Sequence, residues 1–133
     1  CLFTHPKLDE ILRHIGAILL DIAGENVLPA RYAGDEFMIL MSNADKEAAK
    51  LIHATFTQRL DHLNTTILPT MGVTKTEANH VTFSAGLASA PEDMEVSAEP
   101  WHEQLVNKAD QAAMHAKKAG KKNIIVYNPS QRA

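Results

Sequence analysis

The chain has 133 residues, of which 45% are hydrophobic and 22% are charged, and its formal net charge is −3 at pH 7. This composition predicts a globular domain with a substantial core, and it disfavours nucleic-acid binding, which usually requires a basic surplus. The single cysteine, Cys1, excludes an intramolecular disulfide framework. No apolar run approaches the roughly 18 residues of a membrane span, and no signal peptide is recognisable. We therefore expect a cytoplasmic domain without membrane contact.

The sequence pattern in the first third of the chain predicts a helix followed by a β-hairpin. Apolar residues recur at helical spacing over residues 8–26, which predicts one buried stripe of Ile11, Leu12, Ile15, Ile18, Leu19 and Ile22. Two strand-like runs follow, Val27–Tyr32 and Phe37–Met41, and a short polar turn with a glycine joins them. The second run is apolar at every position, so we expect it to be covered on both faces.

A second helix is expected over residues 43–64, with Asn43 or Asp45 as its N-cap. Its spacing predicts a buried face of Ala48, Leu51, Ile52, Phe56 and Leu60. After the turn-rich residues 65–80, a strand is expected at residues 81–89. Gly86 lies within this strand and indicates that another backbone or a ligand comes close.

An acidic loop, a helix from Trp101 to Gly120 and a short strand before Pro129 complete the expected elements. Helices interleaved with a hairpin in this order indicate an α/β (α+β) sandwich. We expect one domain over residues 1–128, with residues 129–133 as a tail or linker.

The strongest candidate for a site is the pair Asp35–Glu36 in the stretch RYAGDEF. Signatures of phosphate loops, dinucleotide sites and nucleophile elbows are absent, and the seven histidines show no metal-ligand spacing. Adjacent carboxylates repel each other, and a hard cation such as Mg²⁺ would hold them together. An ordinary solvated turn explains the same residues, because Gly-Asp is common turn chemistry. The residues alone leave both interpretations open.

Four segments, in order, resemble the GGDEF domains of diguanylate cyclases. RYAGDEFMIL is similar to the family signature with one change, and THPKLDEIL resembles the family's GHxxGDxxL. VTFSAGLA is similar to the strand vTvSiGvA, and ADQAAMHAKKAGKKN resembles ADxALYxAKxxGRN. The resemblance implies a nucleotidyl-cyclase palm-like fold with a ferredoxin-related βαββαβ core, here lacking its first strand. That strand carries DxDxFKxxND in the family, and we expect it upstream of Cys1 in the native protein.

The resemblance also implies that two GTP molecules condense to cyclic di-GMP with release of pyrophosphate. Each domain would hold one GTP, and a homodimer would bring the two together. Asp35 and Glu36 would be the catalytic carboxylates and would bind Mg²⁺ or Mn²⁺. Ala33 and Gly34 would place tight backbone against the nucleotide.

Three further positions match substrate-binding residues of the family. Asp9 would accept hydrogen bonds from the guanine edge, and Lys117 and Lys121 would hold the terminal phosphates. The family's product-inhibition motif RxxD falls on Gly24 and Val27, so feedback by product at that motif is not expected.

Four positions depart from the family pattern. Thr4, Leu8 and Ala33 replace glycines, and Met114 replaces a tyrosine. The methyl group of Ala33 is harmless at negative φ but strained by about 1–2 kcal/mol at positive φ. The departures favour an alternative, a degenerate and catalytically inactive GGDEF domain that binds GTP and regulates an attached domain. A sensory or phosphodiesterase domain is the attached partner that we consider, and a non-catalytic interaction domain is a third interpretation.

Overall fold

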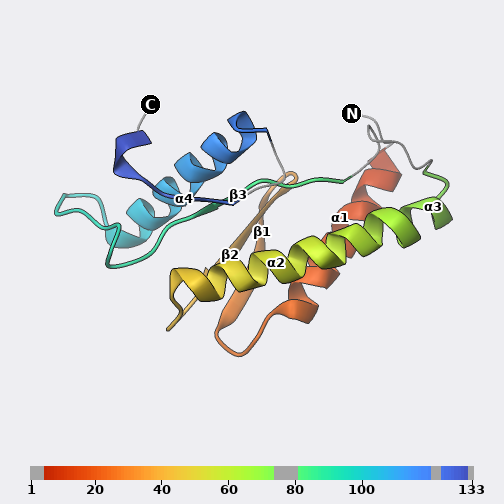
Figure 1. Ribbon diagram of the computed structural model, residues 1–133, viewed down its shortest axis with the longest axis horizontal. Coiled ribbons are helices and arrows are strands. Elements are labelled where there is room, and N and C mark those ends of the chain that lie inside the picture. Colours follow the sequence, from red (N-terminus) through yellow and green to blue (C-terminus); the bar gives the residue numbers. More distant parts are fainter. Residues whose placement is uncertain (1–4, 74–80, 121–123, 132–133) are drawn as a thin grey trace. The chain divides into compact units, whose positions relative to one another are not determined.

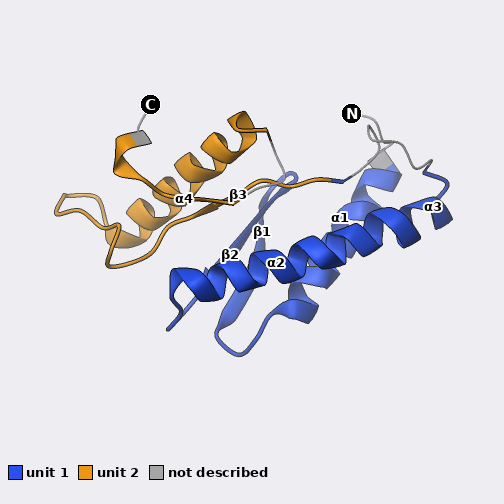
Figure 2. Cartoon of the chain, viewed as in Figure 1, with its two compact units in different colours: residues 1–81 blue, residues 82–133 orange. Residues whose placement is uncertain are grey.

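The computed structural model describes residues 5–73, 81–120 and 124–131 (Figure 1). The chain forms two compact units, Cys1–Val81 and Thr82–Ala133, which we call unit 1 and unit 2 (Figure 2). Each unit combines helices with a two-stranded sheet, which confirms the expected mixed class. None of the helices in the described ranges is long and apolar enough to cross a membrane.

Unit 1 contains the N-terminal helix, the hairpin and the second helix with its irregular end. In chain order its elements are α1 (His5–Ile22), β1 (Val27–Ala33), β2 (Glu36–Met41), α2 (Lys46–His62), the π-helical turn η1 (Leu63–Ile67) and α3 (Leu68–Thr70). Asp45 caps α2, because its Oδ1 accepts a hydrogen bond of 2.8 Å from the backbone N–H of Ala48. The prediction of a helix, a hairpin and a helix is therefore confirmed.

The core of unit 1 lies where α1 meets α2 and β1. Its buried apolar residues are Ile11, Leu12, Ile18, Leu19, Phe56, Leu60, Leu63, Leu68 and Val73. Two expectations about burial are wrong. Leu51 on α2 is 68% exposed, and β2 is not covered on both faces, since Leu40 is 52% exposed. Leu40 pairs across the hairpin with Leu28, which is also exposed, so one face of the hairpin stays open.

The hairpin has a bulge and a two-residue loop. Arg31 pairs with Phe37 and Ala33 pairs with Glu36, so Tyr32 is the extra residue of the bulge and Gly34–Asp35 form the loop. Gly34 has φ +49°, whereas Ala33 and Asp35 are not among the residues with positive φ. A glycine at positive φ in the first loop position is the pattern of a type II′ turn. Within this turn, the conformation that favours glycine is thus confined to Gly34.

Unit 2 has a small parallel sheet packed on a long helix. Its elements are β3 (Ala85–Leu87), α4 (Trp101–Lys118), β4 (Ile124–Val126) and the 3₁₀-helix η3 (Pro129–Gln131). β3 is shorter than the expected strand over residues 81–89. It pairs with β4, and the pairing extends to a hydrogen bond of 2.7 Å from the N–H of Tyr127 to the carbonyl of Leu87.

Gly86 lets β3 lie directly against α4. A Cβ atom built on Gly86 would collide with the backbone carbonyl oxygen of Ala109 and the backbone nitrogen of Ala113. The facing residues Ala112 and Ala116 are small and buried. The expected close approach at Gly86 is therefore confirmed, and the approaching group is the backbone of α4.

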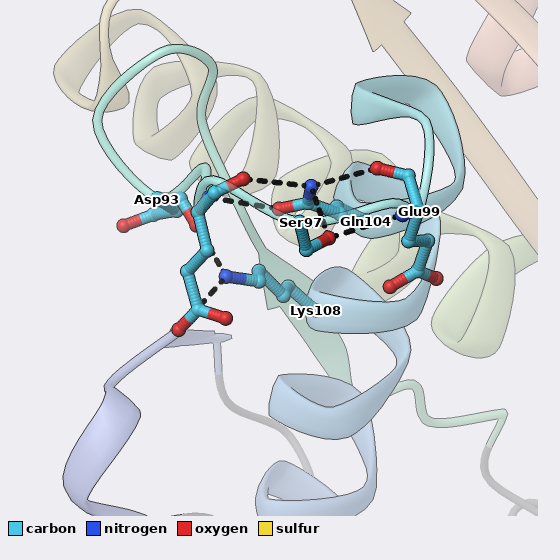
Figure 3. Close-up of polar contacts among 6 residues, drawn as sticks. Asp93, Ser97, Glu99, Gln104 and Lys108 are labelled. Carbon is cyan, nitrogen blue, oxygen red and sulfur yellow. Dashed lines mark hydrogen bonds and ion pairs between the residues drawn. The ribbon is translucent and has the colours of Figure 1, made fainter.

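A buried glutamine and a buried lysine fasten the acidic loop to α4 (Figure 3). The Oε1 of Gln104 accepts from the N–H of Glu95 at 2.8 Å, and its Nε2 donates to the carbonyls of Glu95 and Glu99 at 3.0 and 2.9 Å. The Nζ of Lys108 donates to the carbonyl of Asp93 and lies 3.6 Å from the Glu95 carboxylate. It also lies 4.9 Å from the centre of the Tyr127 ring. The Gln104 amide thus satisfies backbone N–H and C=O groups of this loop.

The first prediction concerns Gly86. Gly86→Ala should lower the free energy of unfolding by about 3 kcal/mol, because the added methyl forces β3 away from the α4 backbone. Gly16→Ala is the matched control, since a Cβ at Gly16 meets no atom within 4 Å. That change should stabilise helix α1 by roughly 0.5–1 kcal/mol. Urea unfolding of the full-length protein measures both, and equal effects would contradict the packing described.

The second prediction concerns Gln104. Gln104→Glu keeps the shape but removes the donating amide and places a carboxylate beside two carbonyl oxygens. We expect a loss of about 3 kcal/mol in unfolding free energy, because buried groups lose their partners. Gln111→Glu makes the same change at an exposed position of α4 and should be nearly neutral. Thermal unfolding of both variants provides the comparison, and a neutral Gln104→Glu would show that the loop does not depend on this side chain.

Candidate functional site

The acidic turn, Ala33 to Glu36, forms the tip of the hairpin. Asp35 is the second loop residue, Glu36 begins β2, and both carboxylates lie at exposed positions. Adjacent exposed carboxylates offer hard oxygen ligands. This donor set fits Mg²⁺ or Mn²⁺, which take one or two protein carboxylates together with substrate phosphates. No cluster of three or more His, Cys, Asp or Glu side chains that could hold a metal occurs in the described part of the chain.

Ala33 fits the backbone of the turn without strain. It is the last residue of β1, is exposed, and pairs with Glu36 across the hairpin. Its φ is outside the left-handed region, so a Cβ is permitted there. The neighbouring Gly34, in contrast, has φ +49° and could not be replaced as freely. Ala33 therefore has the backbone conformation in which its methyl group causes no strain.

A hollow of about 460 Å³ lies between α1 and the hairpin in unit 1. Asp9 lines it from α1, as do Arg13 and Gly16, and Arg31 and Phe37 line it from the strands next to the acidic turn. The remaining lining residues are mostly apolar: Leu12, Leu19, Leu20, Pro29 and Ala30. An apolar surface with a few charged groups is the usual make-up of a site for a small molecule with a flat ring.

Arg13 and Arg31 were not singled out from the sequence. Arg13 follows Asp9 by one helical turn, a spacing that places both on one face of α1. In the sequence, Arg31 is only the first residue of the stretch RYAGDEF, and no pattern assigns it a role. Its Nε–H donates a hydrogen bond of 2.8 Å to the carbonyl oxygen of Gly34. A contact between residues three apart across a bulge cannot be read from strand alternation, because the bulge shifts the register.

Two further sequence candidates are the lysines expected to bind phosphate. Lys117 is exposed in the last turn of α4, which belongs to unit 2, and Lys121 lies outside the described residues. The structure thus brings Asp9, Arg13 and Arg31 together at the hollow. It places Asp35 and Glu36 at the tip of the same hairpin. His53 does not line this hollow; it lies on α2, where burial lowers its pKa.

Comparison with known proteins identifies relatives along almost the full chain. One relative is named Probable diguanylate cyclase DgcE, from Escherichia coli (strain K12), and is 24% identical over 129 residues. The match covers 97% of this chain but 11% of that protein, so the chain spans a small part of its length. A solved structure of an EAL/GGDEF domain protein from M. capsulatus matches with a TM-score of 0.66 and 25% identity, over 96% of this chain and 75% of that one.

The structural likeness confirms the expected fold class, an α+β fold close to that of a solved GGDEF-containing structure. The described residues form one two-stranded sheet in each unit, β1–β2 and β3–β4. The family described as "Diguanylate cyclase, GGDEF domain" matches residues 2–123. The chain therefore belongs to the GGDEF domain family of diguanylate cyclases.

Proposed function

We propose that this chain is the catalytic part of a diguanylate cyclase that condenses two GTP molecules to cyclic di-GMP and pyrophosphate. The observation that carries the proposal is the acidic turn. It keeps both carboxylates, and its backbone accommodates Ala33 without positive φ. Family membership supports the same chemistry.

Asp35 and Glu36 are the residues that would hold Mg²⁺ or Mn²⁺. A bound divalent cation neutralises charge on the phosphates during phosphoryl transfer. The protein's own contribution is to present two consecutive exposed carboxylates and to leave the approach to Gly34 open, since no atom lies within 4 Å of a Cβ built there. The nucleotide phosphates can therefore come close to the backbone of the turn.

The hollow beside α1 would hold the guanine base. Asp9 accepts from the N1–H and N2–H groups of guanine, which adenine lacks in that arrangement. Leu12, Leu19 and Phe37 supply apolar surface for the ring. Lys117 and Lys121 would bind the terminal phosphates as point charges.

The reaction needs two domains. The 3′-hydroxyl of each GTP attacks the α-phosphorus of the other. In each of the two attacks an O3′–Pα bond forms, the hydroxyl proton passes to solvent, the bond from Pα to the oxygen bridging to the β-phosphate breaks, and one pyrophosphate leaves. Because one site binds one nucleotide, a homodimer that places two sites face to face completes the reaction. Catalysis is then mainly positioning and charge neutralisation.

A second candidate is a degenerate domain that binds GTP and regulates an attached domain. The substitution of Leu8 for glycine directly before Asp9 favours it, because a bulky side chain now adjoins the guanine-reading position. The solved neighbour's name pairs EAL with GGDEF, which supports an attached domain of that kind. We place either form of the protein in the cytoplasm, where GTP is available.

The third prediction tests the metal-binding role of Asp35. Asp35→Asn should lower cyclic di-GMP formation at least about 100-fold, because a neutral amide is a weak ligand for the cation that stabilises the transition state. Asp61→Asn, at an exposed position of α2, should leave the rate unchanged. The assay is chromatographic detection of product from GTP with Mg²⁺ or Mn²⁺. Turnover by Asp35→Asn at the wild-type rate would refute the assignment.

The fourth prediction separates the active from the degenerate form. Ala33→Gly should change turnover less than about threefold, because Ala33 already has a permitted backbone conformation. Gly34→Ala should strain the loop by about 1–2 kcal/mol and lower turnover clearly. Steady-state kinetics on both variants tests this. A large gain in activity in Ala33→Gly would instead show that the methyl group had inactivated the site.

A further inference from the structure

We propose that Arg31 is a positioning residue that aims the Asp35 carboxylate. The inference rests on the proposed metal-binding role of the acidic turn. Arg31 lies on β1, and its Nε–H donates to the carbonyl oxygen of Gly34 at 2.8 Å. This is a side-chain hydrogen bond to the residue that directly precedes Asp35 in the loop.

The carbonyl of Gly34 controls the orientation of Asp35. The peptide unit is planar, so the Gly34 oxygen, the Asp35 nitrogen and the Asp35 Cα move as one rigid group. Fixing the oxygen therefore fixes the plane from which the Asp35 side chain projects. Rotation of this plane would change the direction of the Asp35 carboxylate relative to that of Glu36.

Without a tether this plane would be poorly defined. Gly34 has the greatest backbone freedom of any residue type, and a Cβ at Gly34 would meet no atom within 4 Å, so packing does not restrain the loop. Among the described residues, the bond from Arg31 is the side-chain hydrogen bond that the structure gives to the loop carbonyl. The bulge at Tyr32 lies between donor and acceptor in the chain. An arginine is well suited here because its planar guanidinium presents Nε–H in a fixed direction.

A competing role for Arg31 would be direct contact with nucleotide phosphate, since Arg31 also lines the hollow. The two roles depend on different properties. Positioning needs an N–H donor at the Nε position, whereas phosphate binding needs positive charge. Glutamine places its amide Nε2 at the same point along the side chain as the arginine Nε and carries no charge. Lysine keeps the charge but has a methylene there.

The fifth prediction uses this contrast in the full-length protein. Mn²⁺ binding, measured by electron paramagnetic resonance without nucleotide, should weaken about tenfold in Arg31→Lys and Arg31→Met, because loss of a charged hydrogen bond frees the loop. Arg31→Gln should stay within about threefold of wild type. Asp35→Asn gives the electron paramagnetic resonance signal expected when the turn lacks its Asp35 ligand, and so serves as the baseline. Arg59→Lys and Arg59→Gln, on α2 where Arg59 pairs with Asp21, are the matched controls and should not change binding.

The outcomes distinguish this inference from the proposed function. Wild-type Mn²⁺ affinity in Arg31→Lys together with weakened binding in Arg31→Gln would overturn the positioning role. Equal Mn²⁺ affinity in all Arg31 variants would also overturn it, and so would the absence of Mn²⁺ binding by the wild type. Failure of wild type to form cyclic di-GMP, with the expected order of Mn²⁺ affinities, would refute cyclase activity and leave the positioning role standing. Where turnover occurs, Arg31→Lys should lower kcat and leave KM for GTP within about threefold. Unchanged circular dichroism checks folding.

Discussion

The two-residue loop Gly34–Asp35 is the constraint on which the proposed chemistry depends. It lets the hairpin reverse direction in the smallest space, and it leaves Asp35 and Glu36 as neighbours at the tip. A type II′ loop requires positive φ at its first residue alone, and that residue is Gly34. The alanine before it stands in the strand, where a methyl group costs nothing. The backbone of this turn therefore accommodates a side chain at position 33 far better than at position 34.

Each unit relies on a close contact that small or polar residues permit. In unit 2 the absence of a side chain at Gly86 allows β3 to touch the backbone of α4, and Gln104 fastens the acidic loop to the same helix. These contacts fix the course of α4, which carries Lys117 in its last turn. In unit 1 the buried stripe of α1 holds the helix against β1, so Asp9 lines the hollow beside the hairpin. Core packing within each unit thus sets the positions of Lys117 on α4 and of Asp9 on α1.

Much of the fold could be predicted from the sequence, because hydrophobic periodicity indicates which residues are buried and the order of the motifs indicates the topology. The α1 stripe, the hairpin and the close approach at Gly86 follow directly from residue spacing. The exposure of Leu40 and Leu51 did not, since an apolar run cannot tell how many faces find a partner. The bond from Arg31 to Gly34 was equally hidden, because it depends on a bulge at Tyr32 that shifts the register. The roles of Asp9, Asp35, Glu36 and Lys117 and the single-domain boundary stay predictions.

We propose above all that the turn with Ala33 binds a cation through Asp35 and Glu36 while a guanine nucleotide lies beside it. A crystal structure of the full-length protein with a non-hydrolysable GTP analogue and Mn²⁺ tests this most directly, since anomalous scattering locates the metal. We expect Mn²⁺ within about 2.0–2.2 Å of a carboxylate oxygen of the turn and of a phosphate oxygen. The guanine should lie against Asp9. Nucleotide bound elsewhere, or a metal that contacts neither Asp35 nor Glu36, would contradict the proposed site.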